Sequence, residues 1–547
     1  MLIDTRKVDT SDAIIADVCI VGGGAAGITL ALELADQTFT IILLESGGER
    51  PDPTTQHLYA GKNIGLAHEP PETSRSRYLG GSTNCWGGWC RPLDKLDFEE
   101  RPWIANSGWP ITKEDLLPYY VRSHDWLQLS EFHYEIDHWS EEIQRLKAAI
   151  FSIEASGLCN IVDQLSPPTR FGKFYRSRLE KARNIKTFLF ANVTEILTNS
   201  NATHATGVAV RTVNGKSFVI KARTIVLAAG GIETARLLLL SNKVQTEGLG
   251  NAHDLVGRYY MDHPRILSTR VKIPDARRYR PLYDATLHRI HRGVGSKRMR
   301  LEIHLAPGPD VQRGMKLPNS RTYLVARHDN DVSKSYLALK ALQNALSGRK
   351  QFGYPYSKIV PDVARQLSIL LRYTPMTLAT IGEVFLNSFL ATQEFSLESV
   401  LEPIPNPDSR VMLGPERDFF GQNQVEIDWR LTEQDKLHFI ALNKLIVDRL
   451  SKTGLVIPLE SGLPYFEAWP ENVVGCWHHM GTTRMHTDPA QGVVDMDCKV
   501  HGIHNLFIVG SSVFPTVGSD SPTITLVSLA LRLAEKIRKD FQNPRNH

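Results

Sequence analysis

The chain has 547 residues, of which 42% are hydrophobic and 22% charged, a composition that excludes disordered and fibrous proteins and allows a sizeable core. Lysine and arginine exceed aspartate and glutamate by 63 − 59 = +4, too little on this length to indicate nucleic acid or a membrane surface as a partner. Six cysteines are too few for a disulfide scaffold. Cys85 and Cys90 lack a second pair at zinc-ligand spacing, so no metal site is expected.

Targeting signals are missing from the sequence as given. The first 15 residues contain no apolar run of signal-peptide length, and no stretch approaches the 18 apolar residues of a membrane-spanning helix. We therefore expect a cytoplasmic protein without a membrane span.

The first predicted element is a buried parallel strand at residues 16–21 (ADVCIV), where apolar and β-branched residues follow one another. A helical pattern follows at residues 25–35, and a second apolar strand at residues 40–44 ends in Glu45. The turn between the first strand and the helix has the spacing G-x-G-x-x-G, formed by Gly22, Gly24 and Gly27. Together these features predict a dinucleotide-binding βαβ unit.

Each part of this unit has a role toward a dinucleotide. Gly22 allows the tight turn, Gly24 lets the backbone approach a pyrophosphate, and Gly27 lets the helix pack closely on the strand. The helix N-terminus offers free N–H groups to the phosphates, and Glu45 can accept hydrogen bonds from the ribose hydroxyls of adenosine. The alternative is a tight turn without a ligand.

The next segment favours FAD over NAD. An NAD domain would continue with a further βαβ unit, whereas this chain enters a polar loop and then the segment GGSTNCWGG at residues 80–88. Four glycines and three small polar residues cannot build a core, but they suit backbone that packs against a flat ligand. A plain surface loop is the alternative.

Residues 107–240 contain a second strand–glycine–helix unit. Thr112 is predicted to cap a helix, with Asp115 three residues further on. The other expected elements are a helix at 141–155, strands at 184–198 and 206–222 with a turn at Asn214-Gly215, a buried strand at 224–229 and a helix at 232–240. Gly230 and Gly231 join the last two elements, so the nucleotide domain is expected to be discontinuous.

Residues 266–470 differ in character and are interpreted as the bulk of a substrate domain. They mix short alternating strands with helices at 337–346 and 363–373 and contain no glycine-rich phosphate loop. Residues 277–300 carry eight lysines or arginines and one acid, Asp284. This basic segment indicates either an anion- or partner-docking surface or a solvated face, and the small net charge argues against nucleic acid.

The C-terminal fifth combines two clusters with a long helix. Residues 475–485 (GCWHHMGTTRM) hold two adjacent histidines beside a tryptophan and a Gly-Thr turn. A buried strand is expected at 506–509, followed by a tight loop at Gly510. A long helix is expected from Pro522 to about residue 539.

These segments together resemble the glucose–methanol–choline (GMC) family of FAD-dependent oxidoreductases. The N-terminal fingerprint is followed by segments similar to the family's flavin loop (80–88), its middle signature (227–239) and its His-x-x-Gly-Thr…Arg-Met motif (478–485). Residues 500–516 resemble the family's return strand. The resemblance extends over nearly the whole chain, although residues 266–400 contribute little.

The resemblance implies an α/β plus α+β architecture, in which a discontinuous Rossmann-like FAD-binding domain carries an inserted antiparallel-sheet substrate domain. The FAD-binding domain is expected to comprise residues 1–106, 184–265 and 471–547. The substrate-binding domain is expected to comprise residues 107–183 and 266–470.

The family's functional positions carry over to this sequence residue by residue. The expected cofactor-binding residues are Gly22, Gly24, Gly27, Glu45, Gly81, Ser82, Asn84, Cys85, Val193, Gly230, Gly510, Ser511, Pro522 and Thr523. The expected catalytic residues are His478 and Ser521. Some members attach FAD covalently through a histidine in the flavin loop, but here Cys85 precedes Trp86 and that histidine is missing, so non-covalent FAD is expected.

One position departs from the family pattern. Members normally pair the catalytic histidine with an Asn or a second His just before a proline, where this chain has Ser521. Because a serine cannot act as a general base at neutral pH, His478 is expected to be the main proton acceptor, with Ser521 orienting the substrate oxygen. Asp520 or His479 could compensate, although His479 falls at a variable position and is interpreted as a packing residue.

The implied reaction is oxidation of an alcohol by hydride transfer to flavin N5 while His478 accepts the hydroxyl proton. SGWPITKEDLLPYY (107–120), VGRYYMDHP (256–264) and PNPDSRV (405–411) resemble the bacterial branch of sugar dehydrogenases, pyranose oxidases and glycoside 3-oxidases. We therefore expect the substrate to be a secondary ring hydroxyl of a sugar or glycoside.

Several alternatives remain open at this stage. They are oxidation of a non-sugar alcohol, a non-redox lyase that retains FAD, a pyridine-nucleotide enzyme, and a binding or assembly protein that uses the basic segment. The electron acceptor is either O2 or a soluble acceptor, and the sequence does not decide between them. Oxidases of this branch often associate, so the resemblance also allows a homo-oligomer.

Overall fold

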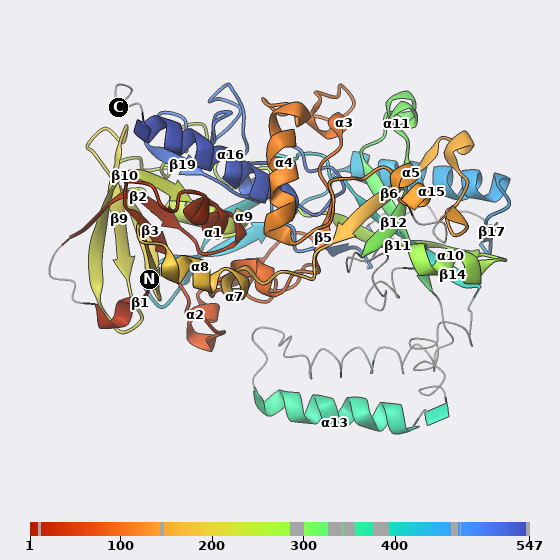
Figure 1. Cartoon of the computed structure of the whole chain (residues 1–547), viewed down its shortest axis with the longest axis horizontal. Coiled ribbons are helices and arrows are strands. Elements are labelled where there is room, and N and C mark those ends of the chain that lie inside the picture. Colours follow the sequence, from red (N-terminus) through yellow and green to blue (C-terminus); the bar gives the residue numbers. More distant parts are fainter. Residues whose placement is uncertain are drawn as a thin grey trace.

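The structure is a computed structural model of the chain. It describes residues 1–8, 13–142, 147–284, 300–326, 338, 342, 356–372, 374–375, 393–460, 469–470 and 472–542. Within these ranges the chain forms two large sheets, which follow one another along the long axis of the molecule (Figure 1).

The first sheet is mainly parallel and has the strand order β1-β7-β3-β2-β10-β9-β8, with β19 also pairing β10. Its strands are β1 (Leu2–Asp4), β2 (Ile14–Val21), β3 (Ile41–Leu44), β7 (Ile185–Leu189), β8 (Asn192–Thr198), β9 (Ala205–Arg211), β10 (Ser217–Leu227) and β19 (Leu506–Ile508). Strands β2, β3, β7 and β19 run parallel to their neighbours, as buried apolar runs favour, and β10 runs parallel to β2 and β19. The parallel strands end on one edge of the sheet, where α/β proteins build their ligand sites.

Strand β10 differs from its predicted form. The sequence suggested one strand ending at residue 222 and another at 224–229, but the structure has a single strand of 11 residues. Its first half pairs antiparallel with β9 and its last residues pair parallel with β19, while β2 runs along its other side. The polar residue Arg223, which broke the apolar pattern, lies within the strand without interrupting it.

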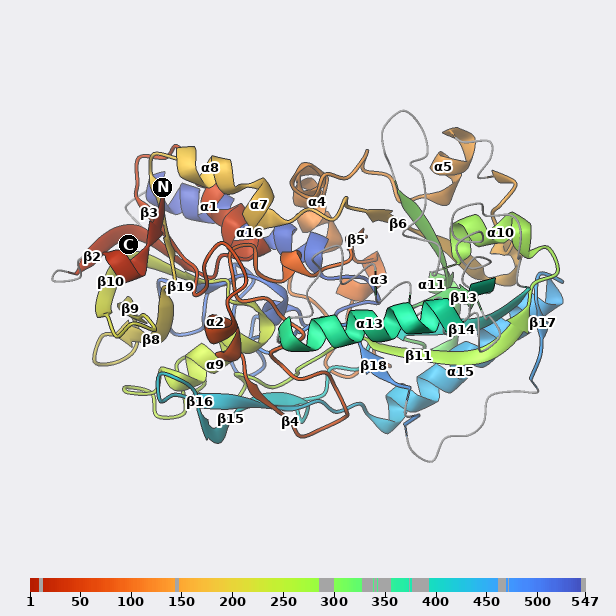
Figure 2. The same cartoon turned by 90° about the horizontal axis from the view of Figure 1, so that it is seen from below.

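Three helices cover the first sheet and pack against one another (Figure 2). They are α1 (Ala25–Glu33), α4 (Lys113–Leu127) and α16 (Thr523–Gln542). Helix α16 contacts both α1 and α4. The predicted cap of α4 is confirmed, because the Thr112 hydroxyl accepts a hydrogen bond from the amide of Asp115 while the Asp115 carboxylate accepts one from the amide of Thr112.

The second sheet is antiparallel, with the order β17-β11-β14-β13-β12-β6-β5 and β18 pairing β11. Its strands are β5 (Trp89–Cys90), β6 (Leu158–Leu165), β11 (Pro264–Lys272), β12 (Leu301–Pro307), β13 (Ser320–Ala326), β14 (Glu394–Leu401), β17 (Ile457–Pro458) and β18 (Val474–Gly475). Helix α15 (Glu433–Lys452) packs on it, and α10 (Ala276–Tyr283) lies beside β12. A third sheet joins β15 (Arg410–Arg417), β16 (Asn423–Asp428) and β4 (Gly61–Asn63).

The remaining elements complete the described part of the chain. They are η1 (Thr5–Lys7), α2 (Pro53–His57), η2 (Gly81–Asn84), α3 (Lys95–Phe98), α5 (Ile136–Glu142), η3 (Glu154–Ser156), α7 (Phe171–Phe174), α8 (Arg176–Lys181), α9 (Gly230–Leu240), α11 (Pro309–Met315), α13 (Tyr356–Arg372) and η4 (Ser511–Val513).

The buried apolar side chains form two cores, one around each large sheet. We propose that these cores mark the FAD-binding and substrate-binding domains, with boundaries that differ from those expected. Residues 113–127 and 171–179 lie within the stretch assigned to the substrate domain, yet Tyr120 and Leu179 are buried in the first core. Conversely, β5 pairs with β6 of the second sheet although it belongs to the first predicted segment.

Three further expectations have different outcomes. The predicted helix at 141–155 is confirmed only in part: residues 141, 142 and 147 are helical and residues 143–146 lie outside the described ranges, but residues 154–156 form a single 3-10 turn before β6. The predicted helix at 363–373 corresponds to α13, whereas nearly all of 337–346 lies outside the described residues. Residues 285–299 of the basic segment also lie outside them, and its described part includes Arg280, which pairs with Asp284 in the interior.

No helix among the described residues is both long and apolar enough to cross a membrane.

Candidate active site

A cavity of about 1440 Å³ lies between the two sheets. It is larger than the roughly 300–1,000 Å³ typical of small-molecule pockets, so it has room for a dinucleotide and a second ligand. The predicted site residues that line it are Gly22, Gly24, Glu45, Gly81, Ser82, Cys85, Val193, Gly230, His478, Gly510, Ser511, Ser521, Pro522 and Thr523. Gly27 and Asn84 lie behind this lining.

Two glycines of the first turn, Gly22 and Gly27, have no room for a side chain. A Cβ atom on Gly22 would lie 2.5 Å from the carbonyl oxygen of Ala228, and the φ of Gly22 is +114°. A Cβ on Gly27 would lie 1.9 Å from the carbonyl oxygen of Gly22. Gly24 faces open space in the cavity and forms the N-cap of α1. The turn therefore presents bare backbone and the helix N-terminus to the cavity, as a pyrophosphate requires.

Glu45 lies at the carboxyl end of β3 and is 5% exposed. Its two oxygens accept hydrogen bonds from the amides of Gly23 (3.0 Å) and Gly47 (2.8 Å). Burial raises the pKa of the carboxyl group, while the Gly47 amide and the charge of Arg77 oppose that rise. A carboxylate has about four acceptor positions, so Glu45 can still accept ribose hydroxyls.

The flavin-loop segment is held in place by its own side chains. Asn84 donates a hydrogen bond to the carbonyl of Leu79 (3.1 Å), and Thr83 donates one to the carbonyl of Gly80. Gly80 has a φ of +101°, a conformation that favours glycine. Cys85 lines the cavity, and its sulfur lies 3.4 Å from the hydroxyl of Ser76. Asn84 thus shapes the loop from behind.

A buried group of charges lines the cavity near Glu45, and sequence patterns gave no sign of it. Arg75 and Arg77 lie over the ring of Tyr59, with guanidinium carbons 4.0 and 4.6 Å from its centre. Both pair with Glu233 of α9. Burial alone would raise the pKa of Glu233, but these arginines and Arg236 lower it to about 2. The residues come from three separate segments, so no local spacing links them.

The two adjacent histidines of the C-terminal motif lie in a loop that is held by one carboxylate. Asp262 accepts hydrogen bonds from three successive amides, those of Cys476, Trp477 and His478, at 2.9–3.0 Å. Trp477 has a φ of +64°, which costs a non-glycine residue of the order of 1 kcal/mol or more. The Asp262 hydrogen bonds hold this unfavourable backbone in place.

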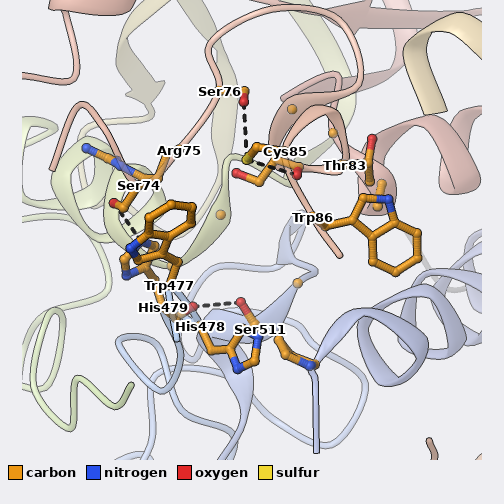
Figure 3. A pocket seen from close by; sticks show the side chains of 18 of the residues that line it. Ser74, Arg75, Ser76, Thr83, Cys85, Trp86, Trp477, His478, His479 and Ser511 are labelled. Atoms are coloured by element: carbon orange, nitrogen blue, oxygen red, sulfur yellow. Dashed lines mark hydrogen bonds between the residues drawn. The ribbon is translucent and has the colours of Figure 1, made fainter. Parts of the chain in front are cut away.

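The side chain of His478 is half-buried and lies at the wall of the cavity (Figure 3). Its Nδ1 lies 2.8 Å from Nδ1 of His263, and the two rings are perpendicular. Its Nε2 has no hydrogen-bond partner among the described residues. Burial, followed by the neighbouring His263, holds the pKa of His478 well below its usual value. The imidazole is therefore neutral at physiological pH and able to accept a proton.

Comparisons with known proteins agree with this geometry. Residues 405–530 match the family model described as GMC oxidoreductase, and residues 17–249 match the model described as FAD dependent oxidoreductase. The chain thus combines an FAD-dependent oxidoreductase domain with the C-terminal domain of GMC oxidoreductases. It is an FAD-dependent enzyme that acts on CH–OH groups, and the glycine turn, the buried Glu45 and the large cavity fit that cofactor.

Individual relatives are distant. A 2-methyl-1,2-propanediol dehydrogenase of Mycolicibacterium austroafricanum is 25% identical across 98% of this chain and 97% of its own length. A C-glycoside 3-oxidase of Arthrobacter globiformis is 31% identical over 23% of each chain. The crystal structure of a pyridoxine 4-oxidase from "Mesorbium loti" has a TM-score of 0.57 at 18% identity, covering 96% of this chain and 99% of that one. At this identity the structural likeness shows the fold alone.

His479, interpreted from the sequence as a packing residue, also lines the cavity. Its ring nitrogens contact the hydroxyls of Tyr260 (2.8 Å) and Ser74 (3.1 Å), and its carbonyl accepts a hydrogen bond from Ser511. Burial lowers its pKa to about 3. Both nitrogens are thus engaged by protein groups.

The segment around Ser521 places two neighbouring side chains differently. Ser521 lines the cavity, whereas Asp520 is buried behind it, 3.3 Å from Arg321. Burial, opposed by Arg321 and Arg91, raises the pKa of Asp520 to about 7. Asp520 therefore belongs to an internal charge cluster and does not line the cavity with His478.

The antiparallel sheet supplies the part of the cavity that the sequence analysis could not specify. The lining there includes Trp89, Arg265, Glu302, Arg321, Tyr323, Glu398 and Trp477. Its charges are compensated, since Arg321 contacts Asp163 and Asp520, and Arg265 faces Glu398. The indole N–H of Trp89 donates to the carboxylate of Glu302. No spacing rule links the whole set, because only Arg321 and Tyr323 share a strand, β13, and the other residues lie on separate strands or loops.

The sequence analysis expected no metal site because Cys85 and Cys90 lack a second pair of ligands. A different cluster of potential metal ligands lies outside the cysteines. In the described part of the chain, Glu131, His133 and His138 bring potential ligand atoms within 4.8 Å of one another. The two imidazole rings are stacked, with centres 3.8 Å apart and planes at 13°. The in-plane lone pairs of stacked rings do not converge on one ion, and these residues lie outside the cavity lining.

We expect Gly27→Ala to abolish FAD retention, because the added methyl group would lie against the carbonyl oxygen of Gly22 and push α1 away from β2. The measurement is the ratio of flavin to protein absorbance after purification, together with thermal unfolding. Gly314→Ala is the matched control, since Gly314 lies in α11 with open space around it. Normal FAD content in the Gly27 variant would contradict the close-packing role.

Proposed function

We propose that this enzyme oxidises a secondary alcohol to a ketone, with a ring hydroxyl of a sugar or glycoside as substrate and His478 as general base. The observation that carries this proposal is the half-buried, neutral His478, which lines the cavity with its Nε2 free of hydrogen bonds from the described residues. The bound FAD supplies the hydride acceptor. The protein's own contribution is to bind the alcohol, orient it and take its proton.

Proton acceptance is the role of His478. A neutral imidazole nitrogen at the cavity wall can accept the hydroxyl proton as the C–H bond breaks. The hydroxyl of Ser521, which also lines the cavity, offers one hydrogen bond to orient the substrate oxygen. The alternative partners considered from the sequence, His479 and Asp520, are engaged elsewhere.

The chemistry of the antiparallel wall supports an uncharged polyhydroxylated substrate. The arginines and carboxylates of the wall are paired with one another, so they can exchange hydrogen bonds with hydroxyl groups without requiring a charged ligand. Trp477 is 42% exposed and offers a flat apolar surface of the kind against which sugar rings pack. The C-glycoside 3-oxidase among the relatives acts on such a molecule, as its name states.

A second candidate substrate class is a small non-sugar alcohol. The relative that aligns over nearly the full length is named for 2-methyl-1,2-propanediol. The chemistry at His478 would be the same, and only the use of the antiparallel wall would differ.

We also propose that FAD is held without a covalent bond. Cys85 is the nucleophilic side chain of the flavin loop, and burial raises its pKa, which keeps it a thiol. Release of intact FAD on acid precipitation would agree with this, and retention of flavin by the denatured chain would contradict it.

A substrate panel tests the proposed substrate class. Free sugars, O- and C-glycosides and simple alcohols are mixed anaerobically with the holoenzyme, and bleaching of the flavin absorbance is recorded. We expect sugars or glycosides to reduce the flavin fastest, and peroxide formation on admitting air would identify O2 as the acceptor. Fast reduction by small diols alone would favour the second candidate, and reduction by no alcohol would contradict both.

His478→Ala is expected to retain FAD and to lose flavin reduction by at least about 100-fold, because general-base catalysis contributes roughly 10²–10⁴-fold. Anaerobic stopped-flow absorbance measures the rate. His504→Ala, a substitution of an exposed histidine outside the cavity lining, is the control and should leave the rate unchanged. A near wild-type rate in the His478 variant would remove this residue from the mechanism.

The lowered pKa of His478 predicts a specific pH dependence. Only the neutral imidazole accepts a proton, so the rate should fall as pH drops through the pKa of His478. Because that pKa lies well below 6.5, the rate of flavin reduction should remain level from pH 8 to 6.5 and decline only at lower pH. A decline centred at pH 6.5 or above would show that this imidazole is not buried as described.

A further inference from the structure

We propose that His263 is a positioning residue that fixes the tautomer of His478, leaving the lone pair of His478 Nε2 free for the substrate proton. This inference rests on the proposed role of His478 as the base. His263 lies in the segment VGRYYMDHP (256–264), and the sequence alone indicates no role for it.

The first step is the bond between His263 and a backbone carbonyl. Nε2 of His263 lies 2.9 Å from the carbonyl oxygen of Gly518. A carbonyl oxygen can only accept a hydrogen bond, so Nε2 must carry the hydrogen. His263 is fully buried, and burial together with the charge of Arg321 lowers its pKa to about 4. A neutral imidazole has one N–H, so Nδ1 of His263 is an acceptor.

The second step follows from the contact between the two histidines. Nδ1 of His263 and Nδ1 of His478 are 2.8 Å apart, a distance at which one nitrogen must donate to the other. Because Nδ1 of His263 can only accept, the hydrogen lies on Nδ1 of His478. Neutral His478 then has no hydrogen on Nε2, which is the form a general base needs.

The third step is the rigidity of both ends of this chain of hydrogen bonds. Asp262, the residue before His263, holds the amides of residues 476–478, so adjacent residues restrain the backbone and the ring of His478. At the other end, Gly518 has a φ of +55°, and a Cβ there would lie 2.6 Å from a carboxylate oxygen of Asp97. The carbonyl that orients His263 is therefore closely packed.

The arrangement also determines where the substrate proton stays. When Nε2 of His478 accepts the proton, Nδ1 keeps its own hydrogen and continues to donate to His263. The hydrogen-bond chain ends at the Gly518 carbonyl, which cannot take up a proton. His263 thus stabilises the imidazolium by accepting its hydrogen bond and does not relay the proton further.

Three variants of His263 separate this role from simple packing. In His263→Asn the amide oxygen can occupy the place of Nδ1 and accept from His478. His263→Gln can reach the Gly518 carbonyl with its NH₂ group but leaves no acceptor at the position of Nδ1. His263→Leu fills the volume and makes neither bond.

The measurements are FAD content, the maximal rate of anaerobic flavin reduction and the substrate dissociation constant, all on holoenzyme. In serine proteases, a substitution that leaves the catalytic histidine in the wrong tautomer lowers the rate by about 10⁴-fold. We expect the Gln and Leu variants to retain FAD and substrate affinity but to lose at least about 100-fold in reduction rate, while the Asn variant stays within about tenfold of wild type. Equal rates in the Asn and Gln variants would overturn the proposal.

The tautomer of His478 can also be measured in the wild-type holoenzyme, without substituting the buried His263. In ¹⁵N spectra of histidine-labelled protein, the signals that vanish in His478→Ala identify His478. We expect Nδ1 protonated and Nε2 unprotonated, and the reverse would overturn the proposal. If His478→Ala reduced flavin at the wild-type rate, the proposed role of His478 as base would be wrong. If His478→Ala were inactive while His263→Leu and His263→Gln were fully active, only the positioning role of His263 would fail.

Discussion

The hydrogen bonds that the Asp262 carboxylate accepts from three consecutive amides are the constraint on which the active site depends. They hold Trp477 in the left-handed region and so turn the next residue, His478, toward the cavity wall. Burial alone would raise the pKa of Asp262, but the hydrogen bond from His68 holds it well below its usual range. The carboxylate is therefore charged throughout the physiological pH range, so it can accept the three amide hydrogen bonds across that range.

Burial acts on the histidines in the opposite sense. His263, His478 and His479 are all enclosed by protein, and in each the charged form is disfavoured by loss of solvation. The site thus combines a permanently charged clamp with neutral rings. This combination lets one imidazole accept a proton during catalysis and requires that its resting tautomer be chosen by hydrogen bonds, which His263 and the Gly518 carbonyl provide.

The remainder of the cavity follows the same rule of compensated charge. Near the dinucleotide turn, Glu233 is surrounded by arginines, one of which also pairs with Asp418. Near the antiparallel sheet, Arg321 contacts Asp163 and Asp520. Buried ion pairs of this kind contribute little net stability, but removing one partner leaves an expensive unpaired charge. The arginines Arg265 and Arg321 of the described walls are thus paired with carboxylates, which suits hydroxyl-bearing molecules better than ions.

Local sequence determined the features that depend on neighbouring residues. The close approach of Gly27 to the carbonyl of Gly22 lies within six residues, the cap at Thr112 is a contact with Asp115, and apolar runs such as Ile41–Leu44 predict buried strands. The family motifs likewise led to His478 and to FAD. These elements were predictable because the interactions that stabilise them lie within one turn or one strand.

Only the tertiary structure decided the environment of the base. His263 and His478 are 215 positions apart, and Asp262 and Trp477 are equally remote, so no spacing rule could pair them. The joining of two predicted strands into β10 and the attachment of α4 to the first core were also settled by pairing and packing with distant segments. Hydrogen-bond direction, burial and charge compensation depend on which surfaces meet in the folded chain, and a linear sequence does not specify those meetings locally.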